Sequence, residues 1–383
     1  MKIKKLKFEG HKVLGDLEID FIDETGNPLD TVVFIGDNGT GKTKVLEAIV
    51  ETVGYNKFKG SLESAQIEKT QEGIRLSKDS TNLIVEGMSM KNDIEYLGRN
   101  KFEQKLIIWM KADLSIELDR VTQESIELVE LAEQWSLDDI NEYIIDKINK
   151  EIYKDMSKPA KVAFDNESKE VNDIFAGLDM SVKMIGLSGE SGLPIFKSKQ
   201  EKIVELKDLS SGEKQLFFRM LNLKRLNVND TIIIIDEPET SLHPEWQRKI
   251  IDVYKNIGEN NQIIIATHSP LIIGSVPTES IRIMSRNDEG KIEVHQQDIY
   301  EKSHGKTADY ILKVTMDLDT LRDEKTQKNI DLADELLQNN KYETAKYKKL
   351  MNSLIEQLGS DDQDVLRIQM AQAVRMRKNA ESE

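Results

Sequence analysis

The sequence predicts an α/β fold built around a parallel sheet. The four consecutive isoleucines Ile232–Ile235 and the apolar run 31–35 are both typical of parallel strands that are buried on two faces. The glycine-rich segment Gly36–Thr43 follows the second run directly and precedes a helical pattern. A glycine turn between a strand and a helix lets backbone N–H groups surround phosphate oxygens. These three observations together indicate a nucleotide-binding core.

The composition limits the classes of function. The chain has 383 residues, a formal net charge of −16 and no cysteine. The acidic balance disfavours a protein that coats nucleic acid indiscriminately, and the lack of cysteine excludes disulfides and thiol chemistry. No apolar run approaches the about 20 residues that span a bilayer, and the first residues alternate unlike a signal peptide. We therefore expect a cytoplasmic protein with no membrane partner.

The N-terminal segment predicts three strands and a helix. Residues 3–10 and 17–21 alternate, whereas 31–35 is continuously apolar. The loop that follows has the spacing G-x-x-x-x-G-K-T, in which Lys42 would reach the β- and γ-phosphates and the Thr43 hydroxyl would ligate magnesium. The predicted ATP-binding residues are Gly36, Asp37, Asn38, Gly39, Thr40, Gly41, Lys42, Thr43 and Lys44.

Residues 61–199 carry weaker signals. We interpret them as an antiparallel and helical insertion in a core formed by residues 1–60 and 200–300. A helix is expected to begin at Ser136, which fits a capping box with Asp139. Isoleucines recur every fourth residue along one face of this helix and are expected to be buried. The stripe is Ile140, Ile144, Ile148 and Ile152, and the strands are expected in 83–90, 105–110 and 180–206 with a turn at 189–192.

Acidic side chains follow the isoleucine strand. Asp236 and Glu237 emerge at its carboxyl end, and His268 follows the next buried strand, 262–266. Ligands of open α/β sheets bind outside the carboxyl ends of the strands, so these three side chains are expected to face one ligand. The segment Leu209–Gln215 has the pattern of a helix start.

The chain is expected to be helical from residue 301 onward. Three amphipathic segments, 331–339, 341–358 and 361–378, are separated by Asn339-Asn340 and Gly359-Ser360. An apolar stripe in the second segment must be buried against a neighbouring helix or a partner protein. Its members are Leu350, Met351, Leu354, Ile355 and Leu358. We therefore interpret residues 1–300 as the ATPase domain and residues 301–383 as a helical partner-docking region.

Four motifs occur in the order GDNGTGKT, LSSGEKQ, IIIIDEPETSLHP and IIIATHSP. They resemble the Walker A, signature, Walker B with D-loop, and switch-histidine motifs of ABC-type P-loop ATPases. The sequence pattern DEPE-x-x-LHP followed by THSP is more similar to that of the SMC-like branch, which includes the OLD family, than to that of transporter subunits. The tail beginning HGKTADYIL resembles the ATPase subunits of anti-phage defence systems such as Septu.

The resemblance implies a role for each motif. Two heads would pair head to tail, with ATP between the phosphate loop of one protomer and the signature of the other. Asp236, with Thr43, would hold Mg²⁺, Glu237 would act as general base and His268 would contact the γ-phosphate. The trans signature is Leu209, Ser210, Ser211, Gly212 and Glu213, and the D-loop is Ser241, Leu242 and His243.

Four positions of the family pattern stay open or depart from it. Ser211 replaces the first glycine of the common signature and Glu213 replaces its glutamine. The glutamine that contacts magnesium could be Gln66, Gln71 or Gln104, and no aromatic residue can be assigned to adenine. Asp317 and Asp319 have the D-x-D spacing of a Toprim nuclease, but the tail is too short and strand-poor for that domain, so we expect no intrinsic nuclease activity.

The predicted function is an ATP-binding and ATP-hydrolysing switch. It would form a homo-oligomer, at least a dimer, and gate a protein effector such as a separately encoded nuclease in anti-phage defence. The alternative is an ATP-dependent DNA-binding clamp in repair or recombination, for which Lys2 to Lys12 and Arg375 to Lys378 offer local basic clusters. A third option is the energising subunit of a membrane transporter, which the sequences of the motifs support less well.

Overall fold

The computed structural model describes residues 2–54, 66–69, 73–78, 81–86, 106–110, 127–130, 137–296, 302–316, 318 and 320–381. The chain divides into two compact units, Met1–Ile311 and Leu312–Glu383. The boundary expected from the sequence lies at residue 300.

The centre of the first unit is a seven-stranded sheet. Its middle strands β3 (Thr31–Gly36), β13 (Gln262–Ala266) and β12 (Ile232–Asp236) are parallel, and almost every residue in them is buried. Ile235 pairs with Ile265, which also pairs with Val33, so the carboxyl ends of the three strands are level. The full order is β15 (Ile292–Gln296), β14 (Ile281–Arg286), β3, β13, β12, β7 (Leu106–Met110) and β8 (Glu127–Glu130). The expectation of a buried parallel sheet is confirmed.

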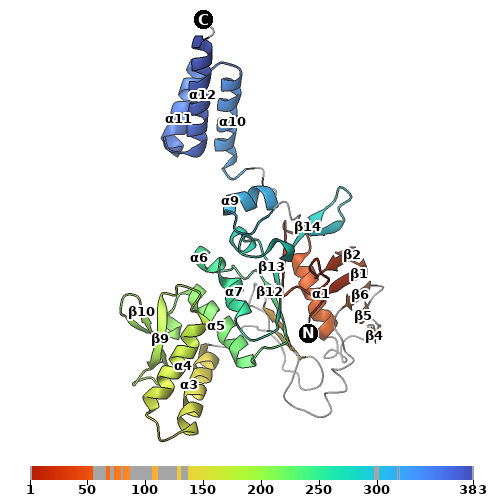
Figure 1. The fold of residues 1–383 in the computed structure, drawn as a ribbon, viewed down its shortest axis with the longest axis vertical. Coiled ribbons are helices and arrows are strands. Elements are labelled where there is room, and N and C mark those ends of the chain that lie inside the picture. The colour runs from red at the N-terminus through yellow and green to blue at the C-terminus, as the bar shows by residue number, and fades with distance from the viewer. Residues whose placement is uncertain are drawn as a thin grey trace. The chain divides into compact units, whose positions relative to one another are not determined.

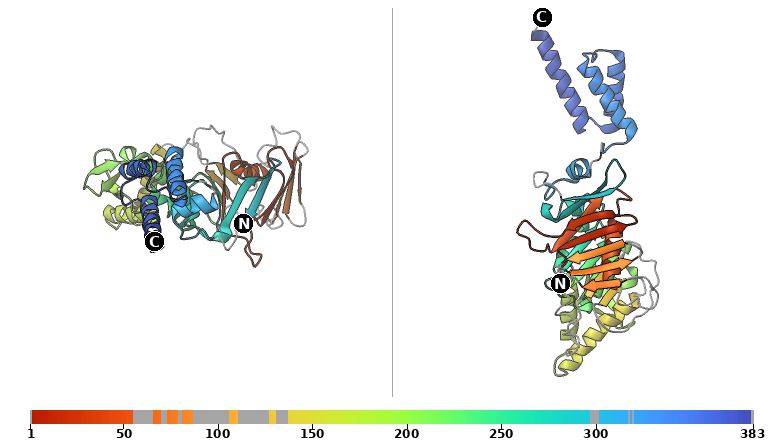
Figure 2. Two further views of the ribbon diagram at one scale, coloured as in Figure 1. Left: turned by 90° about the horizontal axis from the view of Figure 1, so that it is seen from above. Right: turned by 90° about the vertical axis from the view of Figure 1, so that its right-hand side faces the viewer.

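A second, antiparallel sheet packs on the other side of α1 (Lys42–Gly54) (Figure 1). Its strands lie side by side in the right-hand view of Figure 2. Buried side chains of β1 and β2, among them Leu6, Phe8 and Ile19, share one core with Val45 and Ile49 of α1 and Ile264 of β13. The order is β2 (Gly15–Asp20), β1 (Lys5–His11), β6 (Thr81–Glu86), β5 (Gly73–Lys78) and β4 (Gln66–Lys69).

The segment interpreted as an insertion also contributes to the central sheet. β7 pairs in parallel with β12, and β8 pairs in parallel with β7. The strand at 105–110 is therefore confirmed, but it does not belong to a separate antiparallel unit. A short apolar run defines a strand without specifying its partner, because pairing depends on residues far away in the sequence. β6 confirms the strand expected from residue 83, and residues 87–90 lie outside the described ranges.

The rest of the insertion is a small α/β layer beside α5 (Ser211–Leu226). It consists of α3 (Leu137–Lys154), α4 (Ala160–Ile174) and the antiparallel strands β9 (Val182–Leu187), β10 (Pro194–Ser198) and β11 (Ile203–Glu205). Phe217 of α5 contacts the rings of Phe175 and Phe196. Ile140, Ile144 and Ile148 are buried as expected, while Ile152 is half-buried and Ser136 lies outside the described residues.

The second unit is a bundle of three helices: α10 (Glu324–Gln338), α11 (Ala345–Leu358) and α12 (Gln363–Glu381). Met351 and Leu354 of α11 are buried against Ile330 of α10 and Ile368 of α12. The apolar stripe is therefore covered by helices of the same chain. Both expected breaks, at 339–340 and 359–360, are confirmed.

The expectation of continuous helix from residue 301 is wrong. The described residues between 302 and 323 hold only the short helix α9 (Ala308–Tyr310) and a π-helical turn, Ile311–Thr315. The first long helix begins at Glu324, seven residues before the expected 331, because the Asp323 carboxylate accepts a hydrogen bond from the Thr326 N–H and caps it. Asp317 and Asp319 lie outside the described residues.

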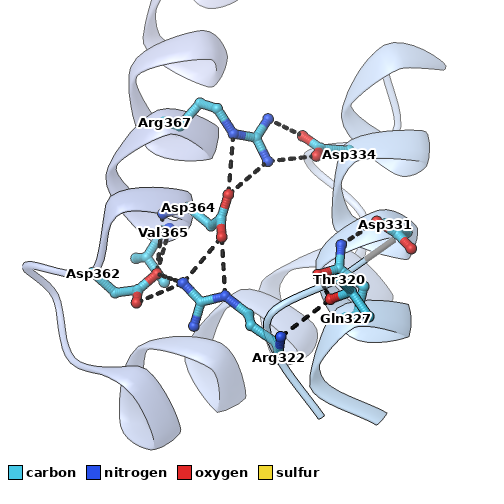
Figure 3. A network of polar contacts seen from close by, with 9 residues as sticks. All are labelled: Thr320, Arg322, Gln327, Asp331, Asp334, Asp362, Asp364, Val365 and Arg367. Carbon is cyan, nitrogen blue, oxygen red and sulfur yellow. Dashed lines mark hydrogen bonds and ion pairs between the residues drawn. The ribbon is translucent and has the colours of Figure 1, made fainter. Parts of the chain in front are cut away.

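Arg322 joins the segment before α10 to the start of α12 (Figure 3). Its guanidinium donates to Asp362 Oδ1 and Oδ2 at 2.9 and 2.8 Å, and its Nε donates to Asp364 Oδ2 at 3.1 Å. Arg367 forms a similar fork with Asp334. Bidentate pairs of this kind hold two segments in one orientation.

Replacing Arg322 by glutamine should destabilise the helical bundle by about 1–2 kcal/mol, because three charge-assisted hydrogen bonds are lost. Hydrogen exchange of the amides in 324–381, measured on the full chain, would report the change. The matched control is Lys328→Gln, which removes an ion pair with Glu324 whose side chains are 72% and 84% exposed. Equal protection in the two variants would show that the Arg322 network contributes nothing to the bundle.

Candidate active site

The glycine loop joins β3 to α1 at the carboxyl edge of the central sheet. Gly36 has φ +141°, and a Cβ there would lie 2.1 Å from the carbonyl oxygen of Met284 on β14. No other residue fits this approach, because a side chain would collide with backbone. Gly39 and Gly41 also have positive φ. The predicted residues Gly36 to Gly41 therefore form the loop, and Lys42, Thr43 and Lys44 open the helix.

Lys42 folds back over the loop. Its Nζ donates to the carbonyl oxygens of Gly36 and Asp37 at 2.8 and 3.0 Å, and the residue is 7% exposed. Burial lowers its pKa, while Asp236 and Asp37 raise it. Lys44 points elsewhere and pairs with Glu47. Of the two lysines, Lys42 presents its charge at the loop.

The loop meets the acidic end of β12 directly. The Thr43 hydroxyl donates to Asp236 Oδ2 at 3.0 Å, although the two residues are 193 positions apart. Asp236 is 8% exposed, and burial raises its pKa to about 6, with the Thr43 hydrogen bond opposing the shift. A hydroxyl and a carboxylate are thus brought together beside the phosphate loop.

Glu237 has a strained backbone. Its φ is +45°, which is uncommon for a residue other than glycine, and its N–H donates to the Ala266 carbonyl at 2.9 Å. This hydrogen bond ties the residue to the end of β13. Positive φ in non-glycine residues is concentrated at functional sites, where the surrounding structure holds the strain. The half-buried Glu237 is therefore fixed at the same sheet edge as Asp236.

His268 follows β13 and is held by Glu239. The His268 N–H donates to Glu239 Oε1 at 2.7 Å. Burial lowers the pKa of the imidazole, Lys42 lowers it further and Glu237 raises it. His268 follows Ala266, which pairs with Asp236 and accepts a hydrogen bond from the Glu237 N–H, so the three side chains start from the same edge of the sheet.

The signature segment lies at the N-terminus of α5. Ser210 caps the helix, and its hydroxyl and N–H both donate to Glu213 Oε2, at 2.6 and 3.0 Å. Leu209, Gly212 and Glu213 are buried, whereas Ser210 and Ser211 are exposed. Ser210 and Ser211 are therefore accessible at the surface, where a second molecule could contact them.

The D-loop packs against this segment. A Cβ on Gly212 would lie 2.5 Å from the Ser241 carbonyl oxygen, so only glycine allows the contact. Ser241 has φ +63°, Leu242 is buried, and His243 Nδ1 accepts from the Glu245 N–H to cap the short helix α6 (Pro244–Gln247). The structure thus forms one cluster from the loop, Walker B and His268, and a second from the signature and D-loop.

The chain after the D-loop forms two short helices. Trp246, Ile250 and Tyr254 have the spacing of one helical face, but α6 ends at Gln247 and α7 (Ile250–Lys255) begins three residues later. Ile250 and Tyr254 are buried and Trp246 is half-buried. Lys249, at the start of α7, has φ −115°, which breaks the helical path.

Three residues that contact the site were not predicted from the sequence. Glu239 binds the His268 backbone, Gln247 bridges Leu242 and Ser269, and Arg286 donates to the Gly39 carbonyl at 2.7 Å. Only Glu239 carries a local signal, since it follows Asp236 and Glu237 in the same motif. Arg286 and Gln247 contact residues that belong to other segments of the chain, and no short sequence motif indicates such contacts.

The described residues also form a cleft of about 840 Å³ away from this chemistry. It is lined by α4, α7 and the turn Ile257–Gly258 that leads into the amino end of β13. The loop, the acids and His268 lie at the opposite, carboxyl ends of the strands. We assign the active site to those ends, because the charged groups and the strained backbone gather there.

The residues fit a magnesium ion bound with a nucleotide. Mg²⁺ prefers hard oxygen ligands and commonly takes one or two protein ligands together with substrate phosphates and water. The Thr43 hydroxyl and the Asp236 carboxylate supply this donor set. Within the described ranges, no group of three or more His, Asp or Glu side chains is arranged to hold a metal ion, and a magnesium bound through ATP needs none. Gln66 lies on β4, and Gln71 and Gln104 lie outside the described residues.

The parallel sheet, the glycine loop before α1 and the acidic end of β12 define an α/β P-loop ATPase of the ABC and SMC-like class, with a helical C-terminal region. The chain belongs to the AAA domain family, because the family model "AAA domain, putative AbiEii toxin, Type IV TA system" matches residues 66–274. The glycine loop precedes the matched residues.

Septu and retron proteins are similar to the chain. It is 23% identical over 365 residues to Septu protein PtuA of Bacillus thuringiensis, covering 84% of this chain and 85% of that protein. A PtuA of Bacillus mycoides (strain KBAB4) is 21% identical, and the match covers 77% of this chain and 42% of the relative. The retron Vc95 probable ATPase of Vibrio cholerae serotype O1 biovar El Tor is 28% identical over 133 residues, 32% of this chain and 26% of that protein.

Among solved structures, an SMC head bound to the C-winged helix domain of ScpA is 16% identical, with a TM-score of 0.43 over 78% of this chain and 98% of that chain. The SMC head domain from Thermotoga maritima is 15% identical, also with a TM-score of 0.43, and covers 78% of this chain and 100% of that chain. Within the described residues, no helix is long and apolar enough to cross a membrane.

Proposed function

We propose that this protein is an ATP-hydrolysing switch that closes as a head-to-tail homodimer around two ATP molecules and gates a protein effector in anti-phage defence. The hydrogen bond of 3.0 Å between Thr43 and Asp236 carries the proposal, because it joins a phosphate loop to an acidic strand end. The match to a Septu protein along 84% of the chain supports the defence setting.

Each group in the site has a task in hydrolysis. When ATP binds, Lys42 releases its hydrogen bonds to the two loop carbonyls and donates to oxygens of the β- and γ-phosphates instead. Glu237 accepts the proton of the attacking water, and its strained backbone keeps the carboxylate at the sheet edge. His268 donates to the γ-phosphate and is held for this by Glu239. Thr43 and Asp236 hold Mg²⁺, which neutralises charge on the phosphates when bound.

The other half of the site comes from a second copy. Ser210 and Ser211 are exposed at the N-terminus of the 16-residue helix α5, where backbone N–H groups and the helix dipole favour an anion. Ser241 and His243 are exposed beside them. A head-to-tail partner would present this surface to ATP, so hydrolysis depends on assembly. The helical region 301–383 is the proposed docking site for the effector.

No observation favours the DNA clamp. Three of the basic residues at the N-terminus are paired with acids: Lys2 with Asp30, Lys5 with Glu18 and Lys7 with Glu9. A phosphate-binding face would need cations that are not already neutralised.

The test is the solution mass of Glu237→Gln, measured by light scattering with and without magnesium ATP. The substitution removes the base but keeps the shape, so the ATP-bound form should accumulate and the mass should double. Ser210→Arg in the same background, which places a bulky cation at the shared surface, should keep the mass unchanged on addition of ATP.

A large assembly already present without nucleotide would contradict the proposal that ATP builds the dimer. The protein would then be a scaffold whose effector is gated by nucleotide. If the solution mass remains that of a single chain in saturating ATP, the proposal that two protomers share each ATP site is contradicted.

A further inference from the structure

Gln247 connects two loops that lie far apart in the sequence. Its Nε2 donates to the Leu242 carbonyl at 3.0 Å, and its Oε1 accepts from the Ser269 hydroxyl at 2.7 Å. Leu242 belongs to the D-loop, and Ser269 follows His268 directly. One half-buried amide therefore bridges the loop after β12 and the loop after β13.

The chemistry of the two partners fixes the orientation of this amide. A carbonyl oxygen only accepts hydrogen bonds, so the NH₂ group must face Leu242. Ser269 Oγ already accepts from the N–H groups of Leu271 and Ile272 at 3.2 and 3.3 Å, where it caps α8 (Pro270–Ile273). Its proton is thus free to be donated to Gln247. A donor on one side and an acceptor on the other are both required, and only an amide side chain of this length offers both.

The bridge continues in both directions. On the D-loop side, the Ser241 carbonyl packs on Gly212 of the signature segment. On the other side, Ser269 adjoins His268, whose N–H is bonded to Glu239. Glu239 lies in the same turn, since its carbonyl accepts from the Leu242 N–H at 2.9 Å. A contiguous set of contacts therefore runs from the start of α5 to His268 within one chain.

We propose that Gln247 is a positioning residue that couples the signature segment and D-loop to the placement of His268. The coupling rests on the proposed ATP hydrolysis, because His268 is assigned there to the γ-phosphate. A partner that engages the signature segment and D-loop of one protomer shifts the Leu242 carbonyl. The shift passes through Gln247 to Ser269 and aligns His268, so that hydrolysis follows closure of the dimer.

Two substitutions of Gln247 test this coupling. Gln247→Glu keeps the shape but replaces the donor with an oxygen that repels the Leu242 carbonyl, and Gln247→Met keeps the length without either polar group. Each should lower kcat about 10-fold, as expected for the loss of one or two buried hydrogen bonds. The ATP concentration at half-maximal rate should change less than twofold, since the phosphate loop is untouched. Arg248→Gln, at the exposed neighbouring position, changes the charge by one as Gln247→Glu does and should leave both values unchanged.

A spectroscopic measurement separates this inference from the proposed function. The chain has five histidines, so the ring signal of His268 can be assigned by NMR from its loss in His268→Gln. In Gln247→Met this signal should shift, whereas in Arg248→Gln it should not. An unchanged signal with unchanged kcat overturns the inference and leaves the ATPase intact. A shifted signal in a protein that does not hydrolyse ATP overturns the function but keeps the positioning role.

A double-mutant cycle tests the far end of the coupling. Gly212→Ala pushes the Ser241 carbonyl, because the added Cβ would lie 2.5 Å from it. The fold-change in kcat that Gly212→Ala causes should be at least about threefold smaller in Gln247→Met than in the original protein, since the transmitting residue is absent. Additive effects would show that Gln247 holds His268 only locally and would overturn the link to the signature segment. Thermal unfolding of all variants identifies any that fail to fold, and Gln247→Met keeps the test usable if Gln247→Glu is among them.

Discussion

Replacing Lys42 by methionine is expected to weaken ATP binding by about 100-fold or more and to abolish hydrolysis. The Lys42 ammonium is 7% exposed and lies over the loop, held by the carbonyls of Gly36 and Asp37. Methionine matches the apolar stem but has neither the charge nor the donors. The phosphates would lose two charge-assisted hydrogen bonds, each of which contributes about 1.5–3 kcal/mol.

Titration calorimetry with a non-hydrolysable ATP analogue measures the affinity, and phosphate release measures the rate. Lys161→Met is the matched control, because Lys161 is exposed on α4 and far along the chain from the loop. It should leave both measurements within twofold. If Lys42→Met bound the analogue as tightly as the control does, the loop would not be the phosphate site, and the nucleotide assignment would have to be withdrawn.

The core of the fold was predictable because its signals are local. Ile232–Ile235 and 31–35 are continuous apolar runs, which only a strand buried on both faces accommodates, and both lie in the middle of the central sheet. The loop was predictable for a similar reason, since the spacing of Gly36, Gly41 and Lys42 is set by backbone geometry over eight residues. The amphipathic periods of α3, α11 and α12 also depend on near neighbours only.

Features set by distant contacts were not predictable. The sequence of β7 predicts a strand, but the parallel pairing of β7 with β12 depends on the packing of the whole sheet. The start of α10 was placed too late, because the polar first turn after Asp323 lacks the apolar period on which the assignment relied. In the site, Gln247 contacts Ser269, which is 22 residues away in the sequence, and Arg286 contacts Gly39, which is 247 residues away. Such contacts follow from the fold and have no motif of their own.

Replacing Asp236 by asparagine is expected to stabilise the nucleotide-free protein and to inactivate it. The Asp236 carboxyl is 8% exposed, and burial raises its pKa from 3.8 to about 6. The folded state therefore holds this proton more tightly than the unfolded state does. Its contribution to stability is present in full below pH 3.8 and is lost as the pH rises through about 6. At pH 8 the ionised group costs up to about 3 kcal/mol, which asparagine avoids.

Denaturant unfolding in EDTA without nucleotide measures this effect. Asp236→Asn should raise the free energy of unfolding at pH 8 and should approach that of the original protein well below pH 3.8, where Asp236 is protonated in both the folded and the unfolded state. The exposed Asp165 of α4, changed to asparagine, should show no such pH dependence. Magnesium-dependent hydrolysis by Asp236→Asn should fall about 100-fold or more, because a carboxylate that would hold the metal is lost. The opposite signs have one cause: Asp236 is ionised in a buried position, where Thr43 and Lys42 offset only part of the cost of burying the charge. A variant that is less stable than the original at pH 8 would show that Asp236 is a structural residue and not a strained functional one.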